Sequence, residues 1–353
     1  MKKFLVVVVI IAVAIAAYLY FKKPVKTEVK PEDQPVVAPV VQQPVVEEPK
    51  TDGVTLFKEG KYEDAIKKLE KEIKNKPVNE QAALTEYLAQ AYDKIGNYVK
   101  AGDLFLQCAN LPEMDRQTKS RHSFTLALKG DLTKEKRDAI KKNLMFINRN
   151  LVFSTSANPP ESISYEINKG DSIFSISNKY NVPAGSDSEG ASYLGQIRRI
   201  NNMKTSNIRA GDNLKVVTGK FSIEVDKSEF TLTLYLNGDF VKEYPIAYGN
   251  PKESPTPEGT FKIVGSSKLV NPPWYKYDKT TGQTTVVPFG DPQHSIGTRW
   301  MTFKESEKIG IHGTNDPSSI GKAITNGCVR MHNEDVEELF DLVPGGTEVT
   351  VKQ

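Results

Sequence analysis

The chain begins with a continuous apolar segment, and its hydrophobic pattern then changes period several times. The run from Phe4 to Phe21 holds no charged residue and is flanked on each side by two lysines. At about 1.5 Å per residue, such a run can cross a hydrocarbon layer of about 30 Å. The pattern therefore predicts a membrane helix within residues 1–23. An uncleaved anchor is favoured over a cleaved signal peptide, for which Ala14 and Ala16 offer a small-x-small site.

Residues 24–53 have no regular apolar period. Proline recurs there every four to seven residues among Val, Gln and Glu, and the segment has no aromatic residue after Lys23. A segment of this composition cannot bury enough apolar surface to fold. We expect an extended spacer that advances about 3.1 Å per residue.

Between residues 54 and 153 the apolar positions follow a helical period, and part of the pattern repeats. The recurring residues are Gly60, Tyr62 and Ala65, which reappear 36 positions later as Gly96, Tyr98 and Ala101. This repeat resembles the tetratricopeptide helix pair, whose nominal period is about 34 residues. Further helices are predicted over 115–128 and 133–151. The resemblance implies a protein partner for the repeats. Cys108, on the second helix of the second repeat, is expected to be buried.

Residues 163–218 read as strand, turn, two helices and strand. Either Asp171 or Ser172 can cap the first helix. The K-G-D-S turn, Asn201 and the G-D-x-L run that ends at Leu214 resemble the LysM module, which implies a βααβ fold and binding of N-acetylglucosamine glycans. The family groove maps to Gly170, Asp171, Ser172, Ile173, Ile208 and Gly211. Residues 184–196 lengthen the link between the helices beyond the family pattern, so a LysM fold retained as a spacer is the alternative.

From residue 219 to residue 353, short runs of period two dominate and predict a mainly-β domain. Thr231 to Leu236 alternates and is followed by Asn237-Gly238, a pair that accepts the positive φ angles of a two-residue hairpin turn. A helix is predicted from Asn333 to Leu342.

The pattern and the two resemblances together predict a multidomain fold: an N-terminal transmembrane helix, an all-α tetratricopeptide-like array, a small α+β domain of the LysM type and a mainly-β C-terminal domain. The charge composition limits the kinds of binding partner that are expected. Lys+Arg 47 against Asp+Glu 44 leaves a formal net charge of +3, a balance that argues against nucleic acid as the main partner.

The candidate chemistry lies in IGIHGTNDPSSIGKAITNGCVRM, residues 309–331, which hold His312 and Cys328. A thiol with a pKa of about 8.5 is only a few per cent ionised at neutral pH and needs a base to become a good nucleophile. His312 is the candidate base. Gly327 allows a tight turn, so that its amide and that of Cys328 can face an oxyanion. No second histidine has ligand spacing from His312, so we expect neither a metal nor another cofactor.

Three blocks of this domain resemble the L,D-transpeptidase (YkuD) catalytic domain. They are T-P-E-G-T-F at 256–261, I-H-G-T at 311–314 and T-N-G-C-V-R at 325–330. The resemblance implies that Cys328 is the nucleophile and that His312 is a base oriented by the backbone carbonyl of Gly313.

The same resemblance assigns substrate binding to Arg330, Asn326 and Thr314. For Arg330 an ordinary buried ion pair is the alternative. Asn326 departs from the family, in which a histidine precedes the Gly-Cys pair, so altered electrostatics of the substrate loop are expected. His294 and His332 are expected at the surface or at the rim of the pocket.

The implied reaction is acyl transfer on peptidoglycan stem peptides that form 3-3 cross-links, with glycan strands bound by the LysM module. Two alternatives stay open: carboxypeptidase or D-amino-acid exchange activity at the same site, and a non-catalytic scaffold that binds the wall. A substrate in the wall implies that the domains face outward from the cytoplasmic membrane.

Overall fold

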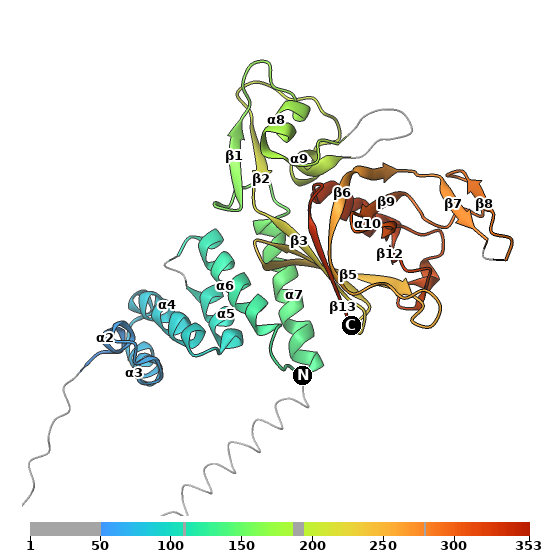
Figure 1. Cartoon of the computed structure of the whole chain (residues 1–353). Helices are drawn as coiled ribbons and strands as arrows, with labels where there is room; N and C mark the ends of the chain where they lie inside the picture. Colours follow the sequence, from blue (N-terminus) through green and yellow to red (C-terminus); the bar gives the residue numbers. More distant parts are fainter. Residues whose placement is uncertain (1–50, 109–110, 186–193, 279) are drawn as a thin grey trace, which may run out of the picture. The chain divides into compact units, whose positions relative to one another are not determined.

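The computed structural model describes residues 51–108, 111–185, 194–278 and 280–353, drawn in colour in Figure 1. The helices that come first are α2 (Gly53–Lys58), α3 (Tyr62–Asn75), α4 (Val78–Lys94), α5 (Tyr98–Gln107), α6 (Glu113–Ala127) and α7 (Lys134–Leu151). The predicted spacer at 24–53 lies almost wholly outside the described residues.

The transmembrane part of the predicted fold class needs correction. Residues 1–23 lie outside the described ranges, and within those ranges no helix is both long and apolar enough to cross a membrane. The longest helix there, α7, has 18 residues, and charged side chains occur along its whole length. The described fold therefore comprises a helical region, a LysM domain and a closed β-sheet domain.

Helices α2 to α5 pack around their own apolar core, in which Ala65 and Ala101 are fully buried. The repeated glycines Gly60 and Gly96 both lie in turns with a φ of 78°, and Tyr62 and Tyr98 begin the helices that follow. The repeated residues thus occupy equivalent positions, although the tetratricopeptide identity of these helices and their protein partner stay predictions. Cys108 is fully buried, as expected, and burial raises its pKa to about 11.

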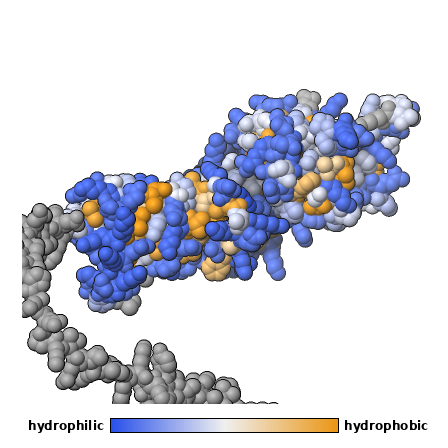
Figure 2. Space-filling model, turned by 90° about the horizontal axis from the view of Figure 1, so that it is seen from below, coloured by the Kyte–Doolittle hydropathy of each residue, from blue (hydrophilic) through white to orange (hydrophobic). Residues whose placement is uncertain are grey.

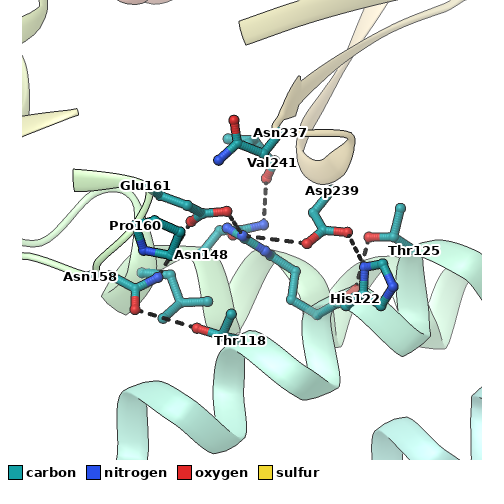
Figure 3. Close-up of polar contacts among 12 residues, drawn as sticks. Thr118, His122, Thr125, Asn148, Asn158, Pro160, Glu161, Asn237, Asp239 and Val241 are labelled. Atoms are coloured by element: carbon teal, nitrogen blue, oxygen red, sulfur yellow. Dashed lines mark hydrogen bonds and ion pairs between the residues drawn. The ribbon is translucent and has the colours of Figure 1, made fainter. Parts of the chain in front are cut away.

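Helices α6 and α7 belong to a different core. Phe124 on α6 and Leu144 on α7 are buried in one cluster with residues of the β-sheet domain. The Asn148 amide donates to the carbonyls of Phe240 and Val241 at 2.8 and 2.9 Å (Figure 3). These two helices therefore fold against the sheet rather than against the preceding repeats alone.

A buried ionic cluster joins the same helices to the chain that enters the LysM domain. Arg121 on α6 has no exposed surface and pairs with Glu161 and with Asp239, and the Asp239 carboxylate also contacts the exposed His122 at 2.9 Å (Figure 3). Lys215 donates from Nζ to the Leu151 carbonyl at 2.6 Å, at the end of α7. Buried charges of this kind are tolerated because each has a partner.

The domain that resembles LysM consists of β1 (Ser162–Glu166), α8 (Ile173–Tyr180), α9 (Gly195–Ile200) and β2 (Asn213–Val217), the predicted βααβ order. The two strands are antiparallel, with Tyr165 opposite Leu214. Ser172 caps α8 and forms a capping box with Ser175, which satisfies amides at the start of the helix.

The C-terminal domain is a closed sheet with one long helix. Its elements are β3 (Phe221–Asp226), β4 (Thr231–Leu236), β5 (Asp239–Gly249), β6 (Gly259–Val270), β7 (Trp274–Tyr277), β8 (Thr284–Val287), β9 (Arg299–Phe303), β10 (Ser306–His312), η1 (Pro317–Ser319), β11 (Ala323–Thr325), β12 (Val329–Met331), α10 (Asn333–Leu342) and β13 (Glu348–Lys352). The order β11-β5-β12-β10-β9-β6-β13-β3-β4 closes on itself because β5 also pairs with β4.

Two local predictions in this domain are confirmed. Asn237 and Gly238 have φ angles of 52° and 87° and connect β4 to β5 as a tight hairpin. Helix α10 has the predicted bounds.

Apolar patches interrupt the mostly hydrophilic surface of the protein in Figure 2. Phe146 on α7, 63% exposed, is among the large apolar side chains that reach solvent.

Candidate active site

The segment that carries Cys328 crosses the end of strand β5. Strand β11 pairs with one edge of β5 in parallel and β12 pairs with the other edge in the antiparallel direction, so residues 326–328 must pass from one side to the other. They pass over Gly249, where an added Cβ would lie 2.7 Å from Gly327 Cα and 2.6 Å from Thr256 N. Glycine at 249 therefore makes the crossing sterically possible.

The turn before Cys328 is constrained from both sides. Gly327 is buried with a φ of 105°, a conformation that L side chains rarely adopt. The Thr325 hydroxyl donates to the Cys328 carbonyl at 2.6 Å, and the Gly249 amide donates to the Thr256 hydroxyl at 2.8 Å. These two bonds fix the Cys328 carbonyl and the end of β5 beneath the turn that presents the thiol.

Cys328 is half-buried, and its thiol donates to the Lys308 carbonyl at 3.6 Å. Burial raises the pKa of the thiol to about 11, against the opposing effects of the Gly310 amide and the Arg330 charge. At neutral pH the thiol is therefore protonated in this arrangement, and it needs a base to become a nucleophile.

His312 is buried at the end of β10, and its ring stacks on Trp300 with centroids 5.6 Å apart. Its Nδ1 lies 2.6 Å from the Gly313 carbonyl oxygen. Since a carbonyl only accepts, Nδ1 carries the proton and Nε2 keeps its lone pair. Burial lowers the pKa of His312 to about 4, with further lowering by Arg330 and His294 against the opposing effect of the Gly313 bond. The imidazole is therefore a neutral base at physiological pH.

The strand register brings these groups to one face of the sheet. His312 is the partner of Arg330 in the parallel pair of β10 and β12. Cys328 precedes Arg330 by two residues, and side chains two apart point to the same face of an extended chain. The buried Arg330 Nε atom has no hydrogen-bond partner within the described residues, and burial lowers the pKa of the guanidinium.

Thr314 and Asn326 occupy different environments. Thr314 is buried, and its hydroxyl donates to the Asp316 carbonyl at 3.3 Å and accepts from the Asp316 amide at 3.0 Å. Asn326 is exposed beside the Cys328 turn. Asn326 is therefore accessible to a substrate, whereas the hydroxyl of Thr314 forms hydrogen bonds within its own loop. The substrate-binding roles of both residues stay predictions.

The LysM residues form two adjacent loops. The Gly211 amide donates to the Ile167 carbonyl at 2.9 Å, which holds the loop at Gly211 beside the one that leads to Gly170. Both glycines are exposed with φ near 90°. Asp171 accepts from the Asn168 amide and the Tyr165 hydroxyl, both at 2.8 Å, and these bonds lower its pKa. Ile173 is buried and Ile208 partly buried in the domain core, so Ile173 offers mainly its backbone to a ligand.

Several residues around the site escaped the sequence analysis. The sequence pattern gives Asn333 only a place in a helix and Gly249 and Trp300 only places in strands, and for Trp300 it leaves open whether the ring lines the substrate cleft or packs. His294 was expected at the surface or pocket rim, which is wrong: it is 4% exposed, and Nε2 lies 2.8 Å from the Pro272 carbonyl oxygen. None of these belongs to a motif with a characteristic spacing. Among the described residues no cluster of His, Cys, Asp or Glu could hold a metal ion.

Comparisons with known families and proteins identify the two C-terminal domains. The L,D-transpeptidase catalytic domain (YkuD) matches residues 220–351, and the LysM domain matches residues 165–217. The putative L,D-transpeptidase YkuD of Bacillus subtilis is 32% identical over 197 residues, which cover 54% of this chain and 99% of that protein. The putative L,D-transpeptidase YkuD of Bacillus licheniformis is 40% identical over 131 residues, covering 37% of this chain and 65% of that protein.

Among solved structures, the catalytic domain of the L,D-transpeptidase from E. faecium is 25% identical, with a TM-score of 0.31, and covers 38% of this chain and 98% of its own. The full-length match to the Bacillus subtilis protein carries the assignment. The chain belongs to the L,D-transpeptidase (YkuD) family, and it carries a LysM domain in front of the catalytic domain. The family supports transpeptidase activity, and the two domains together imply peptidoglycan binding and a cell-wall or extracytoplasmic location.

Proposed function

We propose that this protein is a cysteine-dependent L,D-transpeptidase that forms peptidoglycan cross-links, with Cys328 as nucleophile and His312 as general base. One observation carries the proposal. A neutral histidine, held through Nδ1 by the Gly313 carbonyl, shares a sheet face with a protonated thiol on a tight glycine turn. This pairing is what an activated thiol nucleophile requires.

In the first half-reaction, the Cys328 Sγ atom attacks the carbonyl carbon of the third residue of a donor stem peptide while its proton passes to His312 Nε2. The amides of Gly327 and Cys328 would stabilise the oxyanion. Collapse of the intermediate breaks the peptide bond, and the imidazolium gives its proton to the departing D-alanine amine. A thioester with Cys328 remains.

In the second half-reaction, the side-chain amine of a neighbouring stem attacks the thioester. His312 Nε2 takes the proton that the amine loses, and the Cys328 thiolate leaves and is reprotonated by the imidazolium. The protons and charges of the enzyme thereby return to their initial state. Arg330, Asn326 and Thr314 are proposed to bind the stem peptides.

Incubation of the purified protein with tetrapeptide muropeptides, followed by mass analysis, tests the proposal. A cross-linked dimer is expected. Tripeptide monomer alone would show instead a carboxypeptidase, and exchange of the terminal residue with added D-amino acids would show an exchanger. An absence of all three products, together with no acyl adduct on Cys328, would leave the scaffold interpretation.

A matched pair of variants tests the nucleophile. Cys328→Ala should abolish the product, whereas Cys108→Ala, which removes the other free cysteine from the core of the helices, should retain it. Retention of cross-linking by Cys328→Ala would refute the assignment of the nucleophile.

We further propose that the LysM domain binds peptidoglycan glycan through the loops at 170–173 and 208–211. The adjacency of the two exposed loops supports this site. Binding of N-acetylglucosamine oligomers, measured by calorimetry, should be lost in Ile208→Glu and kept in Ser164→Glu on the exposed side of β1. Equal affinity of the two variants would argue for a LysM fold that serves only as a spacer.

A further inference from the structure

Asn333 connects two backbone segments next to the candidate base. It is the first residue of α10, and its Oδ1 accepts from the Thr314 amide at 3.0 Å and from the Thr298 amide at 3.2 Å. Its Nδ2 donates to the Thr314 carbonyl at 2.9 Å. The side chain thus holds the loop after β10 to the residue that precedes β9.

Two glycines make room for this amide. A Cβ added to Gly297 or to Gly313 would lie 2.2 Å from Asn333 Oδ1, and Gly297 also has a φ of 65°. Neither position can carry a side chain without displacing Asn333. The backbone of both loops is therefore fitted closely around one asparagine.

The bond from Thr314 has a direct geometric link to His312. The Thr314 N–H and the Gly313 carbonyl belong to the same planar peptide group, and in a trans peptide they point in opposite directions. Asn333 accepts at one side of this group, and His312 Nδ1 donates at the other. The orientation of a single peptide plane consequently depends on Asn333.

We propose that Asn333 is a positioning residue for the base: it fixes the Gly313–Thr314 peptide so that the Gly313 carbonyl holds His312 in the Nδ1-protonated form. The proposal rests on the assignment of His312 as base. Hydrogen bonds in a chain polarise one another, so the Thr314 bond also makes the Gly313 carbonyl a stronger acceptor. Without Asn333 the peptide can rotate, and the proton is free to occupy Nε2, which removes the lone pair that the reaction uses.

The chain offers a matched control. Asn201 in the LysM domain makes the same kind of contact, because its Oδ1 accepts from the Lys215 amide at 2.9 Å and its Nδ2 donates to the Ile197 and Lys215 carbonyls at 2.7 and 2.8 Å. Asn201→Ala and Asn333→Ala therefore lose comparable backbone bonds, but only the second touches the loop of His312.

The test compares kinetics and histidine tautomers in the full-length protein. Asn333→Ala should lower kcat about 10- to 100-fold with KM little changed, by analogy with the loss found when a hydrogen-bond partner that orients a metal-bound histidine is removed. ¹⁵N NMR of labelled histidines should show His312 in the Nδ1-protonated form in the wild type and a mixture in Asn333→Ala. Asn201→Ala should leave kcat and the tautomer unchanged.

Asn333→Asp adds a second readout. A carboxylate can still accept from Thr298 and Thr314, but it brings a negative charge near His312, whose pKa also responds to Arg330 and His294. A negative charge favours the imidazolium, so the acidic limb of the pH–kcat profile should move to higher pH.

A wild-type kcat and a pure Nδ1 tautomer in Asn333→Ala would overturn the proposal. If that variant does not fold, an unshifted profile in Asn333→Asp would do the same. The wild-type tautomer is measured without turnover, so a protein that lacks transpeptidase activity but shows the tautomer difference would refute the proposed function and retain the role of Asn333.

Discussion

His312 on β10 and Arg330 on β12 are register partners in a parallel strand pair. The guanidinium thereby lies close enough to lower the pKa of both His312 and Cys328. The two effects have different consequences. Lowering the pKa of the histidine keeps the base neutral, whereas lowering the pKa of the thiol makes its proton easier to remove.

Substitution of Arg330 should separate these effects. Arg330→Met removes the charge, so the pKa of His312 should rise toward its ordinary value and the pKa of Cys328 should rise further above its own. Histidine titration by NMR measures the first change, and the pH dependence of thiol alkylation measures the second. Arg330→Lys keeps the charge and should shift both less. A fall in the pKa of His312 in Arg330→Met would contradict the electrostatic role.

The neutral state of the thiol predicts how Cys328 reacts with a small alkylating agent. Because only the thiolate reacts, the rate should keep rising with pH up to about 11. Mass analysis of the Cys328 peptide after timed iodoacetamide treatment measures this rate, and Cys328→Ala identifies any labelling of Cys108. A plateau already reached near pH 7 would indicate a preformed thiolate and imidazolium pair.

Gly249→Ala should damage the site without changing any group that reacts. The added Cβ would lie 2.2 Å from the Ser254 carbonyl oxygen and 2.7 Å from Gly327 Cα, so the Cys328 turn must move. We expect a loss of about 1–3 kcal/mol in the free energy of unfolding, the range for overpacking, and a fall in kcat. Gly130→Ala is the control, because its Cβ would meet only the Ala127 carbonyl oxygen at 3.4 Å. Equal activity of the two variants would show that the Cys328 turn accommodates a methyl group at position 249.

The buried neutral state of His312 also predicts a dependence of stability on pH. Its pKa is about 4 in the fold and about 6.5 when unfolded, so between these values the unfolded state binds the extra proton. The contribution of His312 to the free energy of unfolding is therefore retained above pH 6.5. It falls by about 3 kcal/mol as the pH drops to 4.

Chemical denaturation of the wild type and of His312→Asn at pH 7 and pH 4.5 measures this term. The wild type should lose more stability than the variant over this interval. Lys268, whose pKa burial lowers to about 7, stays charged across most of the interval and contributes little to the difference. Equal losses in the two proteins would show that His312 is not buried as a neutral group.

The attachment of the LysM domain to α10 gives a stability prediction. The Asp341 carboxylate is buried and accepts from Arg199 Nε at 2.7 Å and from the Gly195 amide at 3.2 Å. Asp341→Ala leaves these donors without their acceptor and should cost about 3 kcal/mol. A double-mutant cycle with Arg199→Ala, read by thermal unfolding, should show that the two losses are not additive. Additive losses would show that the two residues are not coupled.

The sequence by itself predicted the order of the regions and the candidate reacting pair. The change from helical to period-two patterning separates the helices from the sheet. Asn237-Gly238 marks the hairpin because asparagine and glycine are among the few residues that accept the positive φ angles of this turn. The Gly327-Cys328 turn and His312 could be proposed from the sequence because their chemistry constrains residue type at adjacent positions. The predicted membrane helix shows where prediction from the sequence is limited. A run of apolar residues reveals composition but does not reveal the environment in which the segment lies.

Only the tertiary structure decided how the site works. The neutral state of His312 and Cys328 results from burial, which depends on residues far apart in the sequence. Gly249 matters because β11 and β12 take opposite edges of β5, and Asn333 matters because α10 begins beside a peptide group that contacts His312. The order of strands in a sheet and the contacts between loops cannot be inferred from a periodic pattern of residues, because both depend on which distant segments meet after folding.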